Sequence, residues 1–243
     1  MRTSIRKYAQ RPVEDALLNR LLEAAERTQT MGNLQLYSVV VTRSSEMKQK
    51  LAPAHFNQPM VTQAPVVLTF CADYHRTTEW ALLRKGHPGY GNFLSYQNAA
   101  TDALLFCQRF CDLAEEAGLG LCFLGTTVYQ PQLIVDVLHL PRLVMPVTTI
   151  TLGWPDEHPE PSERLPLSAV RHEETYQPVT PETIERDYRA KEDFPVNQEF
   201  VRVNGTETLA QIFTDIRYTA KDCESMSVGL LDCLRHQGFL PEQ

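Results

Sequence analysis

Apolar residues recur along much of this chain at the three- and four-residue spacing of an amphipathic α-helix. Residues 13–27 follow this spacing, and Pro12 suits the start of a helix there. A wider apolar stripe runs over residues 92–117 and stops at Gly118, which predicts a long helix through the middle of the fold. Further helices are predicted at residues 45–51, 74–85, 130–138, 181–193, 207–220 and 225–236.

Shorter apolar segments predict β-strands. Residues 65–72 are apolar almost without interruption, as in a central strand that is covered on both faces. The pair Asn204-Gly205 favours a type I′ turn, so residues 200–209 are predicted to form a hairpin. Other strands are predicted at residues 36–42, 121–124 and 147–152. Together these elements predict an α+β fold with a long buried helix and a helical C-terminal extension.

The composition is that of a globular protein with a sizeable core. Of the 243 residues 43% are hydrophobic, and the net charge is −7, which argues against a generic nucleic-acid surface. No apolar run reaches the roughly 18 residues that a transmembrane helix needs, and no signal peptide opens the chain. We therefore expect a cytoplasmic protein that binds neither nucleic acid nor membrane.

The six cysteines are expected to be small buried apolar residues. Cys107 and Cys111 share a helical face, but no second pair of Cys or His lies at ligand spacing nearby, so no metal site is predicted. The histidines are scattered. His55, His75 and His87 lie in polar loops or at helix ends, and we expect them to face solvent.

The first residues concentrate polar and basic side chains. Three cations and two hydroxyls lie between Arg2 and Lys7. In an extended segment Arg2, Ser4 and Arg6 share one face. Guanidinium groups bind phosphate through paired charge-assisted hydrogen bonds, and a serine hydroxyl adds a donor. The segment is thus a candidate phosphate site, with a solvated basic tail as the alternative.

The usual catalytic motifs are missing from the sequence. Gly-x-Ser-x-Gly, His-Glu-x-x-His, the Walker loop and Gly-x-Gly-x-x-Gly do not occur. No side chain is therefore predicted to be catalytic. We expect the chemistry to belong to a bound cofactor, for which the protein supplies position and electrostatics.

A series of motifs runs along nearly the whole chain. They are Arg2-x-Ser4-x-Arg6, the turn from Thr30 to Gln35, Phe70 to Asp73, Gly118 to Gly125, Leu152 to Pro155, Arg164 to Pro166 and His172 to Pro178. In order and spacing the series resembles the FMN-dependent nitroreductase family. The likeness is to the branch of the oxygen-insensitive NADPH nitroreductases of type A and the related flavin reductases.

This resemblance implies the architecture. The family fold is α+β, with a central mixed or antiparallel sheet, a long buried helix and flanking helices. Its members form an intertwined homodimer, with FMN at the interface and each site built from both subunits. An FMN-binding core would span residues 1–178, and a helical extension packing on the core or on the partner subunit would span residues 179–243.

The resemblance also implies residue roles. Arg2, Ser4 and Arg164 would bind the FMN phosphate, and Thr3 would contribute through its backbone. Arg6 would lie near flavin N1 and the C2 carbonyl, where a cation stabilises the charge of the reduced flavin. The other predicted FMN contacts are Thr30, Asn33, Gln58, Phe123, Leu124, Gly125 and Thr126.

Some positions depart from the family pattern. Ser162-Glu163 stands where the branch commonly has a lysine, which leaves Arg164 as the one cation of its motif. The branch places arginines near residue 200 for the NADPH 2′-phosphate, whereas only Arg202 is nearby here, so the choice between NADH and NADPH stays open. Members usually have a short helix before the first motif, which is either absent here or lies upstream of Met1.

The function implied by the resemblance is that of an FMN-dependent NAD(P)H oxidoreductase. Hydride would pass from the nicotinamide to flavin N5 and then to a nitroaromatic, a quinone or free flavin in the same slot, with ping-pong kinetics. The alternative is a flavin-binding or redox-sensing protein with little turnover. A dimeric scaffold without a cofactor is a third alternative.

Overall fold

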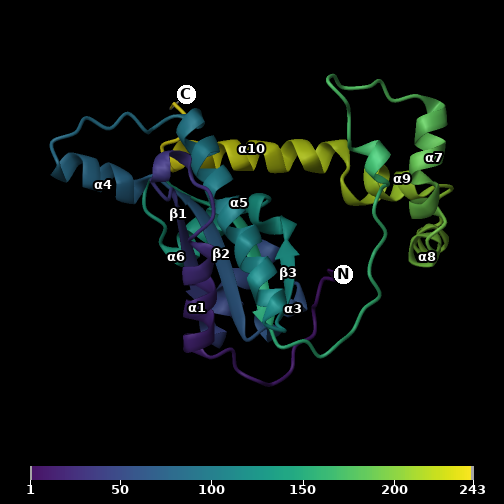
Figure 1. Cartoon of the computed structure of the whole chain (residues 1–243), viewed down its shortest axis with the longest axis horizontal. Coiled ribbons are helices and arrows are strands. Elements are labelled where there is room, and N and C mark those ends of the chain that lie inside the picture. Colours follow the sequence, from purple (N-terminus) through teal and green to yellow (C-terminus); the bar gives the residue numbers. More distant parts are fainter. Residues whose placement is uncertain (1, 242–243) are drawn as a thin grey trace. The chain divides into compact units, whose positions relative to one another are not determined.

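The computed structural model describes residues 2–241, which divide into two compact units (Figure 1). The larger unit holds residues 4–159 and 226–241, and the smaller unit holds residues 2–3 and 160–225. These bounds differ from the expected division at residue 178. The functional division into an FMN-binding core and an extension stays a prediction.

Four strands form one antiparallel sheet in the larger unit, with the order β1-β2-β4-β3. Their bounds are Tyr37–Thr42 (β1), Val66–Asp73 (β2), Gly120–Leu124 (β3) and Val144–Gly153 (β4). β2 lies inside the sheet and all its residues are buried, which confirms the central strand predicted from its apolar run. β1 and β3 are the two edges, and both carry segments of the candidate site.

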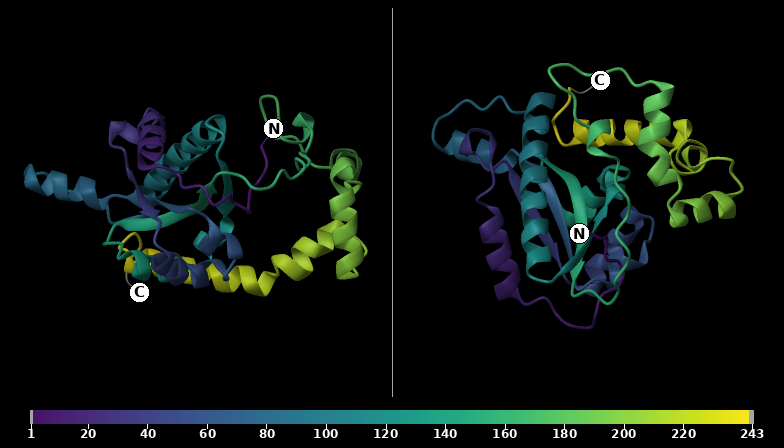
Figure 2. Two further views of the ribbon diagram at one scale, coloured as in Figure 1. Left: turned by 90° about the horizontal axis from the view of Figure 1, so that it is seen from below. Right: turned by 45° about the vertical axis from the view of Figure 1, so that its right-hand side comes forward.

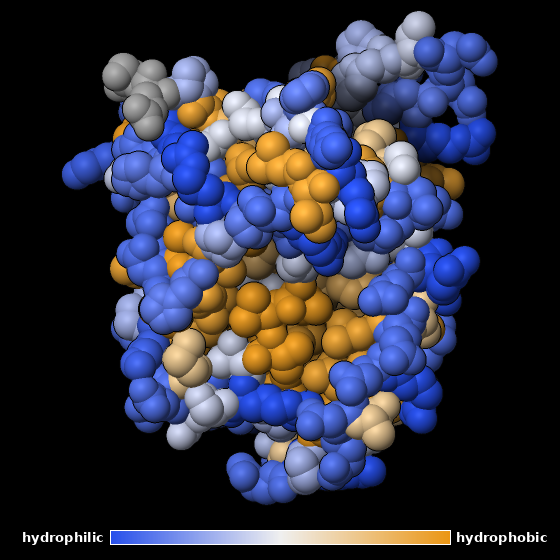
Figure 3. Space-filling view, turned by 90° about the vertical axis from the view of Figure 1, so that its left-hand side faces the viewer, coloured by the Kyte–Doolittle hydropathy of each residue, from blue (hydrophilic) through white to orange (hydrophobic). Residues whose placement is uncertain are grey.

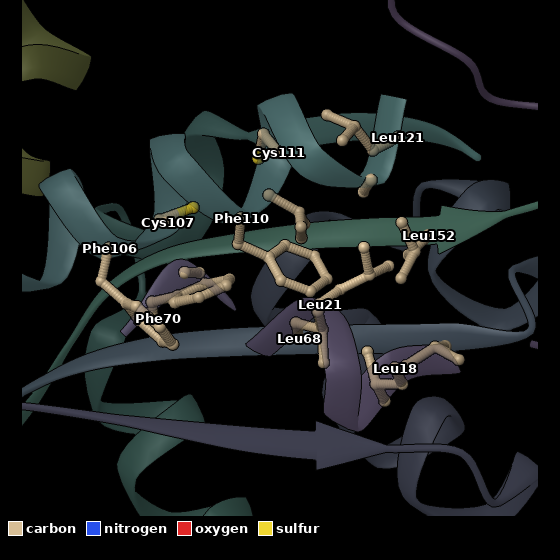
Figure 4. Packing of buried hydrophobic residues seen from close by; sticks show 14 of the residues in the cluster. Leu18, Leu21, Leu68, Phe70, Phe106, Cys107, Phe110, Cys111, Leu121 and Leu152 are labelled. Carbon is tan, nitrogen blue, oxygen red and sulfur yellow. The ribbon is translucent and has the colours of Figure 1, made fainter. Parts of the chain in front are cut away.

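The long predicted helix is confirmed as α5 (Phe93–Glu116). The Asn92 side chain caps it by accepting a hydrogen bond from the Ser95 N–H at 2.9 Å. α5 and α1 (Asp15–Ala25) cover one face of the sheet (Figure 2). Phe106 and Phe110 of α5 contact Phe70 of β2, with ring centroids 5.6 and 6.0 Å apart, in the main apolar cluster (Figure 4).

Short elements complete the larger unit, and α2, α3 and α6 lie on the other face of the sheet (Figure 2). The helices are α2 (Ser45–Leu51), α3 (Pro59–Gln63), α4 (His75–Leu83) and α6 (Pro131–Leu138). The 3₁₀ turns are η1 (Met31–Asn33), η2 (Ala52–His55) and η3 (Gly125–Val128). The helices that the apolar spacing predicts between residues 13 and 193 all form, with ends within two residues of those expected.

The smaller unit is helical, and here one prediction is wrong. α8 runs through the segment expected to be a hairpin, and Gly205 ends it with φ of 65°. An Asn-Gly pair serves a helix end as well as a hairpin, because glycine takes the left-handed conformation in both. The elements here are η4 (Leu167–Ala169), α7 (Pro181–Glu192), α8 (Pro195–Asn204), α9 (Leu209–Gln211) and the π-helix η5 (Ile212–Arg217).

The last helices also differ from their predicted bounds. The expected helix at residues 207–220 is broken after η5 at Tyr218, where the backbone leaves the helical region. α10 (Ala220–His236) then begins five residues earlier than predicted. Its first residues belong to the smaller unit and the rest to the larger one.

Candidate functional site

The N-terminal segment lies beside the edge strand β3. The Ile5 N–H donates to the Leu121 carbonyl at 2.9 Å, and Ile5 is buried between the exposed Ser4 and Arg6. Gly120 makes this approach possible, because a Cβ there would lie 2.7 Å from the Ile5 side chain. The alternation expected from the sequence is confirmed for Ser4 and Arg6, which both face away from the core.

Glu157 fixes the backbone at Arg6. Its carboxylate accepts hydrogen bonds from the N–H groups of Arg6 and Lys7 at 2.5 and 3.0 Å. The bond from the Arg6 N–H is the main influence that lowers the pKa of Glu157. The position of the Arg6 backbone therefore does not depend on its side chain, and Arg6 itself is exposed.

The end of β3 and the turn after it carry four predicted FMN contacts. Leu124 is buried, so it is a core residue, whereas Phe123 is 38% exposed on the same strand. Gly125 is exposed and has open space where a side chain would stand. Thr126, in η3, is half-buried. This turn thus offers an aromatic side chain and accessible backbone beside each other.

A second turn carries Gln58, which directly precedes α3 and is half-buried. Before it, Phe56 and Asn57 both have positive φ, at 51° and 54°. Left-handed backbone costs a non-glycine residue about 1–2 kcal/mol. The turn is held by the Asn57 N–H, which donates to the Ala52 carbonyl at 2.8 Å. Strain of this kind is often found at functional sites.

His55 joins these two turns, and the expectation that it faces solvent is wrong. Its side chain is fully buried, and its Nδ1 lies 2.8 Å from the Thr126 hydroxyl. Burial lowers the pKa of His55 to about 4, so the ring is neutral at pH 7. His87 is exposed and His75 is half-buried. The sequence neighbours of His55 did not indicate its burial, because Ala54 is buried whereas Phe56 is 49% exposed.

One apolar cluster holds these segments together. It contains Ile5 and Tyr8 from the N-terminus, Ala52 and Ala54 from η2, Met60 from α3, and Cys122 and Leu124 from β3. Several predicted site residues lie next to members of this cluster in the sequence, or a few residues after them, so the cluster positions them. We call the resulting set the β3-edge group, which consists of Ser4, Arg6, Gln58, Phe123, Leu124, Gly125 and Thr126.

Thr30 and Asn33, which we call the β1-edge group, lie in the loop before β1. The buried Asp102 of α5 fixes this loop by accepting hydrogen bonds from the N–H groups of Met31 at 2.8 Å and Leu36 at 3.2 Å. Asn33 has φ of 56°. β1 and β3 are opposite edges of the sheet, so the two groups lie at opposite edges of one chain.

The other predicted residues belong to the smaller unit. Arg164 donates from Nη1 to the Ser162 hydroxyl at 2.7 Å and to the Glu163 carbonyl at 2.8 Å. The Glu163 carboxylate lies 3.7 Å from the Lys191 ammonium, which offsets the acid beside Arg164. Arg202 pairs with Glu199 on α8. The FMN roles of Arg2, Thr3 and Arg164 and the nicotinamide role of Arg202 stay predictions.

The cysteines form no cross-links. Five of the six are buried as expected, whereas Cys223 is exposed. Within residues 2–241 no three or more His, Cys, Asp or Glu side chains gather in a way that could hold a metal ion. In the same range no helix is both long and apolar enough to cross a membrane.

Comparison with known proteins identifies the class of protein. The model of the nitroreductase family matches residues 1–154, well over half of the chain. The chain is also 32% identical over 208 residues to the FMN reductase [NAD(P)H] of Bacillus subtilis strain 168, covering 84% of this chain and 82% of the relative. The protein therefore belongs to the nitroreductase family, as its sequence motifs predict.

Solved structures give the same fold. A crystal structure from Bacteroides fragilis NCTC 9343 is similar with a TM-score of 0.98 and 57% identity, over 99% of this chain and 98% of the other. The NADPH:FMN oxidoreductase from Vibrio harveyi, complexed with NAD⁺, is similar with a TM-score of 0.79 and 25% identity, over 99% and 96%. The antiparallel sheet with a long buried helix is thus the nitroreductase fold, which confirms the predicted fold class.

Proposed function

We propose that the protein is an FMN-dependent NAD(P)H oxidoreductase that reduces nitroaromatics, quinones or free flavin. Membership of the nitroreductase family supports this function, as do the relatives named above for FMN reduction and for binding NAD⁺. The observation that carries it is the β3-edge group. This group brings a cation, an exposed aromatic residue and an open glycine backbone to one edge of the sheet.

The β3-edge group fits FMN by its donor chemistry. The open space at Gly125 lets a flat ring approach the backbone, and Phe123 offers apolar surface beside it. Arg6 carries the positive charge that favours a reduced, anionic flavin, while Gln58 and Thr126 offer side-chain hydrogen bonds. When bound, FMN supplies the hydride acceptor and donor. The residues bind it, orient it and tune its charge.

We further propose that the site is completed by a second copy of the chain. The β1-edge group would join the β3-edge group of the partner, because the two groups lie at opposite edges of one sheet. Adjacent strands are about 4.8 Å apart, so four strands separate the edges by roughly 14 Å. Apolar side chains also gather on the face seen in Figure 3. Exposed apolar residues on α4 and α5 are Trp80, Leu82, Leu83, Phe93, Leu94, Leu104 and Leu105.

Light scattering tests the homodimer, and the expected mass is twice that of one chain. A charge at an apolar position, Leu104→Arg on α5, should weaken both the dimer and FMN binding. Gln49→Arg places the same charge on the exposed side of α2, across the sheet, and should change neither. A monomer that retains FMN at micromolar concentration would contradict the shared site.

The visible spectrum of the purified protein, followed by mixing with NAD(P)H under anaerobic conditions, tests the proposed reaction. Bound oxidised flavin and its rapid bleaching support turnover, whereas bound flavin that NAD(P)H reduces only slowly favours the redox-sensing alternative. Arg202 is already paired with Glu199, so we propose little preference between NADPH and NADH. The kcat/KM values for the two donors test this point.

We also propose a cytoplasmic location, which the six cysteines support because they form no disulfide and thiols persist in a reducing compartment. The electron acceptors proposed here are small molecules that would occupy the slot over the flavin. Fractionation of cells that express the chain tests the location. Steady-state kinetics with a nitroaromatic, a quinone and free FMN test the acceptors.

A further inference from the structure

We propose that His55 is a positioning residue of the flavin site, and that it sets the direction in which the Thr126 hydroxyl donates its proton. His55 lies 2.8 Å from this hydroxyl through Nδ1 and is fully buried. The inference rests on the proposed function, because Thr126 belongs to the β3-edge group. It concerns a residue that no feature of the sequence had marked.

The two ring nitrogens of His55 have different surroundings. Nδ1 contacts Thr126, whereas Nε2 is buried without a hydrogen-bond partner in the part of the chain that the structure describes. A neutral imidazole carries its proton on one nitrogen only. Orphaned buried N–H groups are rarer than acceptors that lack a partner. The proton therefore belongs on Nδ1, where it is donated to the Thr126 oxygen.

This tautomer decides what Thr126 offers a ligand. A hydroxyl has one proton, and the Thr126 oxygen accepts from His55, so that proton remains for an acceptor elsewhere. With the other tautomer, Thr126 would donate to Nδ1 and would be only an acceptor toward the ligand. The flavin ring carries carbonyl oxygens and ring nitrogens that accept hydrogen bonds. His55 thus makes Thr126 a donor that matches them.

His55 also joins the two turns of the β3-edge group. Its carbonyl accepts a hydrogen bond from the Gln58 N–H at 3.1 Å, while its ring contacts Thr126. Phe56 and Asn57, both with left-handed backbone, lie between His55 and Gln58 in the sequence. Through one backbone contact and one side-chain contact, His55 therefore links the Gln58 turn to the Thr126 turn. Loss of the ring would release the Thr126 turn from the Gln58 turn, whose own backbone bonds would remain.

The first test reads the tautomer without the cofactor. In ¹⁵N-histidine-labelled protein, NMR should show His55 protonated at Nδ1 and bare at Nε2 between pH 6 and 8. Protonation at Nε2 instead would overturn the inference. Thr126→Val should leave the ring neutral but change the Nδ1 signal. This change would assign the signal to the His55–Thr126 hydrogen bond.

The second test measures FMN affinity by fluorescence titration and the flavin midpoint by redox titration. Thr126→Val should weaken binding by about 2- to 10-fold and lower the midpoint, because a neutral hydrogen bond to the flavin is lost. His55→Leu should act in the same direction and by no more than this, because the Thr126 hydroxyl loses the partner that directs its proton. The double variant should be no weaker than Thr126→Val. Thr126→Ser and His55→Asn, whose amide can replace the Nδ1–H, should stay within about twofold of the wild type.

The outcomes separate the inference from the proposed function. Wild-type protein that binds no FMN overturns both. Wild-type protein that binds FMN, with His55→Leu unchanged in affinity and midpoint, overturns only the role of His55. If His55→Leu does not fold, His55→Asn and the two Thr126 variants decide the question. A merely structural His55 would lower stability without moving the midpoint.

Discussion

Asp102 offers a sharp test of how the fold positions the β1-edge group. Its buried carboxylate bonds to the N–H groups of Met31 and Leu36, on either side of the loop that carries Asn33. The perturbation is Asp102→Ala. It removes both acceptors and leaves the helix intact, because alanine favours helix.

The size of the effect follows from burial. A hydrogen bond to a charged group is worth about 1.5–3 kcal/mol. The Leu36 bond counts in full, because Leu36 is fully buried and water cannot replace the acceptor. The Met31 bond counts for less, because Met31 is 47% exposed. We therefore expect the free energy of unfolding to fall by about 2–4 kcal/mol, with weaker FMN binding.

Urea unfolding at fixed protein concentration measures the change in stability, and fluorescence titration measures FMN affinity. Asp112→Ala is the matched control, since Asp112 lies on the same helix and accepts a hydrogen bond from Gln108 on its surface. That exposed bond should be worth about 0.2–0.5 kcal/mol. If Asp102→Ala is no more destabilising than Asp112→Ala, the loop does not depend on the buried carboxylate.

Three other changes have expected outcomes. The pKa of His55 is about 4 in the folded chain against an ordinary 6.5, so its stabilising contribution is present above pH 6.5 and lost as the pH falls toward 4. The loss approaches about 1.4 kcal/mol per pH unit and about 3 kcal/mol in total, and urea unfolding of wild type and His55→Asn should diverge over this range. Equal pH dependence of the unfolding free energy in the two proteins would refute this role of His55. Arg6→Gln should lower the flavin midpoint by roughly 20–65 mV in a dye-equilibrated titration, and an unchanged or higher midpoint would place Arg6 elsewhere. Arg164→Ala should weaken FMN binding about 10- to 150-fold, and unchanged affinity would remove Arg164 from the site.

Periodicity predicted the elements whose positions are set by burial. β2 is apolar along its length because both of its faces are covered, and α5 has a wide apolar stripe because it packs on the sheet. In both cases the removal of apolar surface from water determines both the apolar pattern of the sequence and the position of the element in the fold. Such segments can be predicted from the chain alone, to within a few residues at their ends.

Local turn chemistry was less informative than periodicity. Asn204-Gly205 ends a helix, although the same pair starts many hairpins, because both uses need only a residue that accepts positive φ. The deciding factor was the preceding segment, where Phe194-Pro195 opens a helix. The hydrophobic residues of this segment fit a helix face as well as a strand. The sequence alone therefore did not decide between a helix and a hairpin.

Some features of the candidate site could likewise be predicted from the sequence, whereas others could not. Alternation in the first residues predicted that Ser4 and Arg6 face one way, and the structure agrees because Ile5 between them is anchored in the core. The burial of His55 could not be read from its neighbours. It depends on Thr126, which lies 71 residues away along the chain. Pairings of this kind become visible only when the fold is known.

The strand order links these observations to assembly. Segments that border β3 are held by one apolar cluster, so they would form one half of the proposed site. The loop before β1 is held separately, by Asp102 of α5. Because the halves are fixed by different contacts at opposite edges, no small rearrangement of one chain would bring them together. A second copy would supply the missing half without disturbing either set of contacts, since each edge group would meet the other across the interface. FMN would then bind where both copies contribute, and its binding would stabilise the assembly as well as the fold.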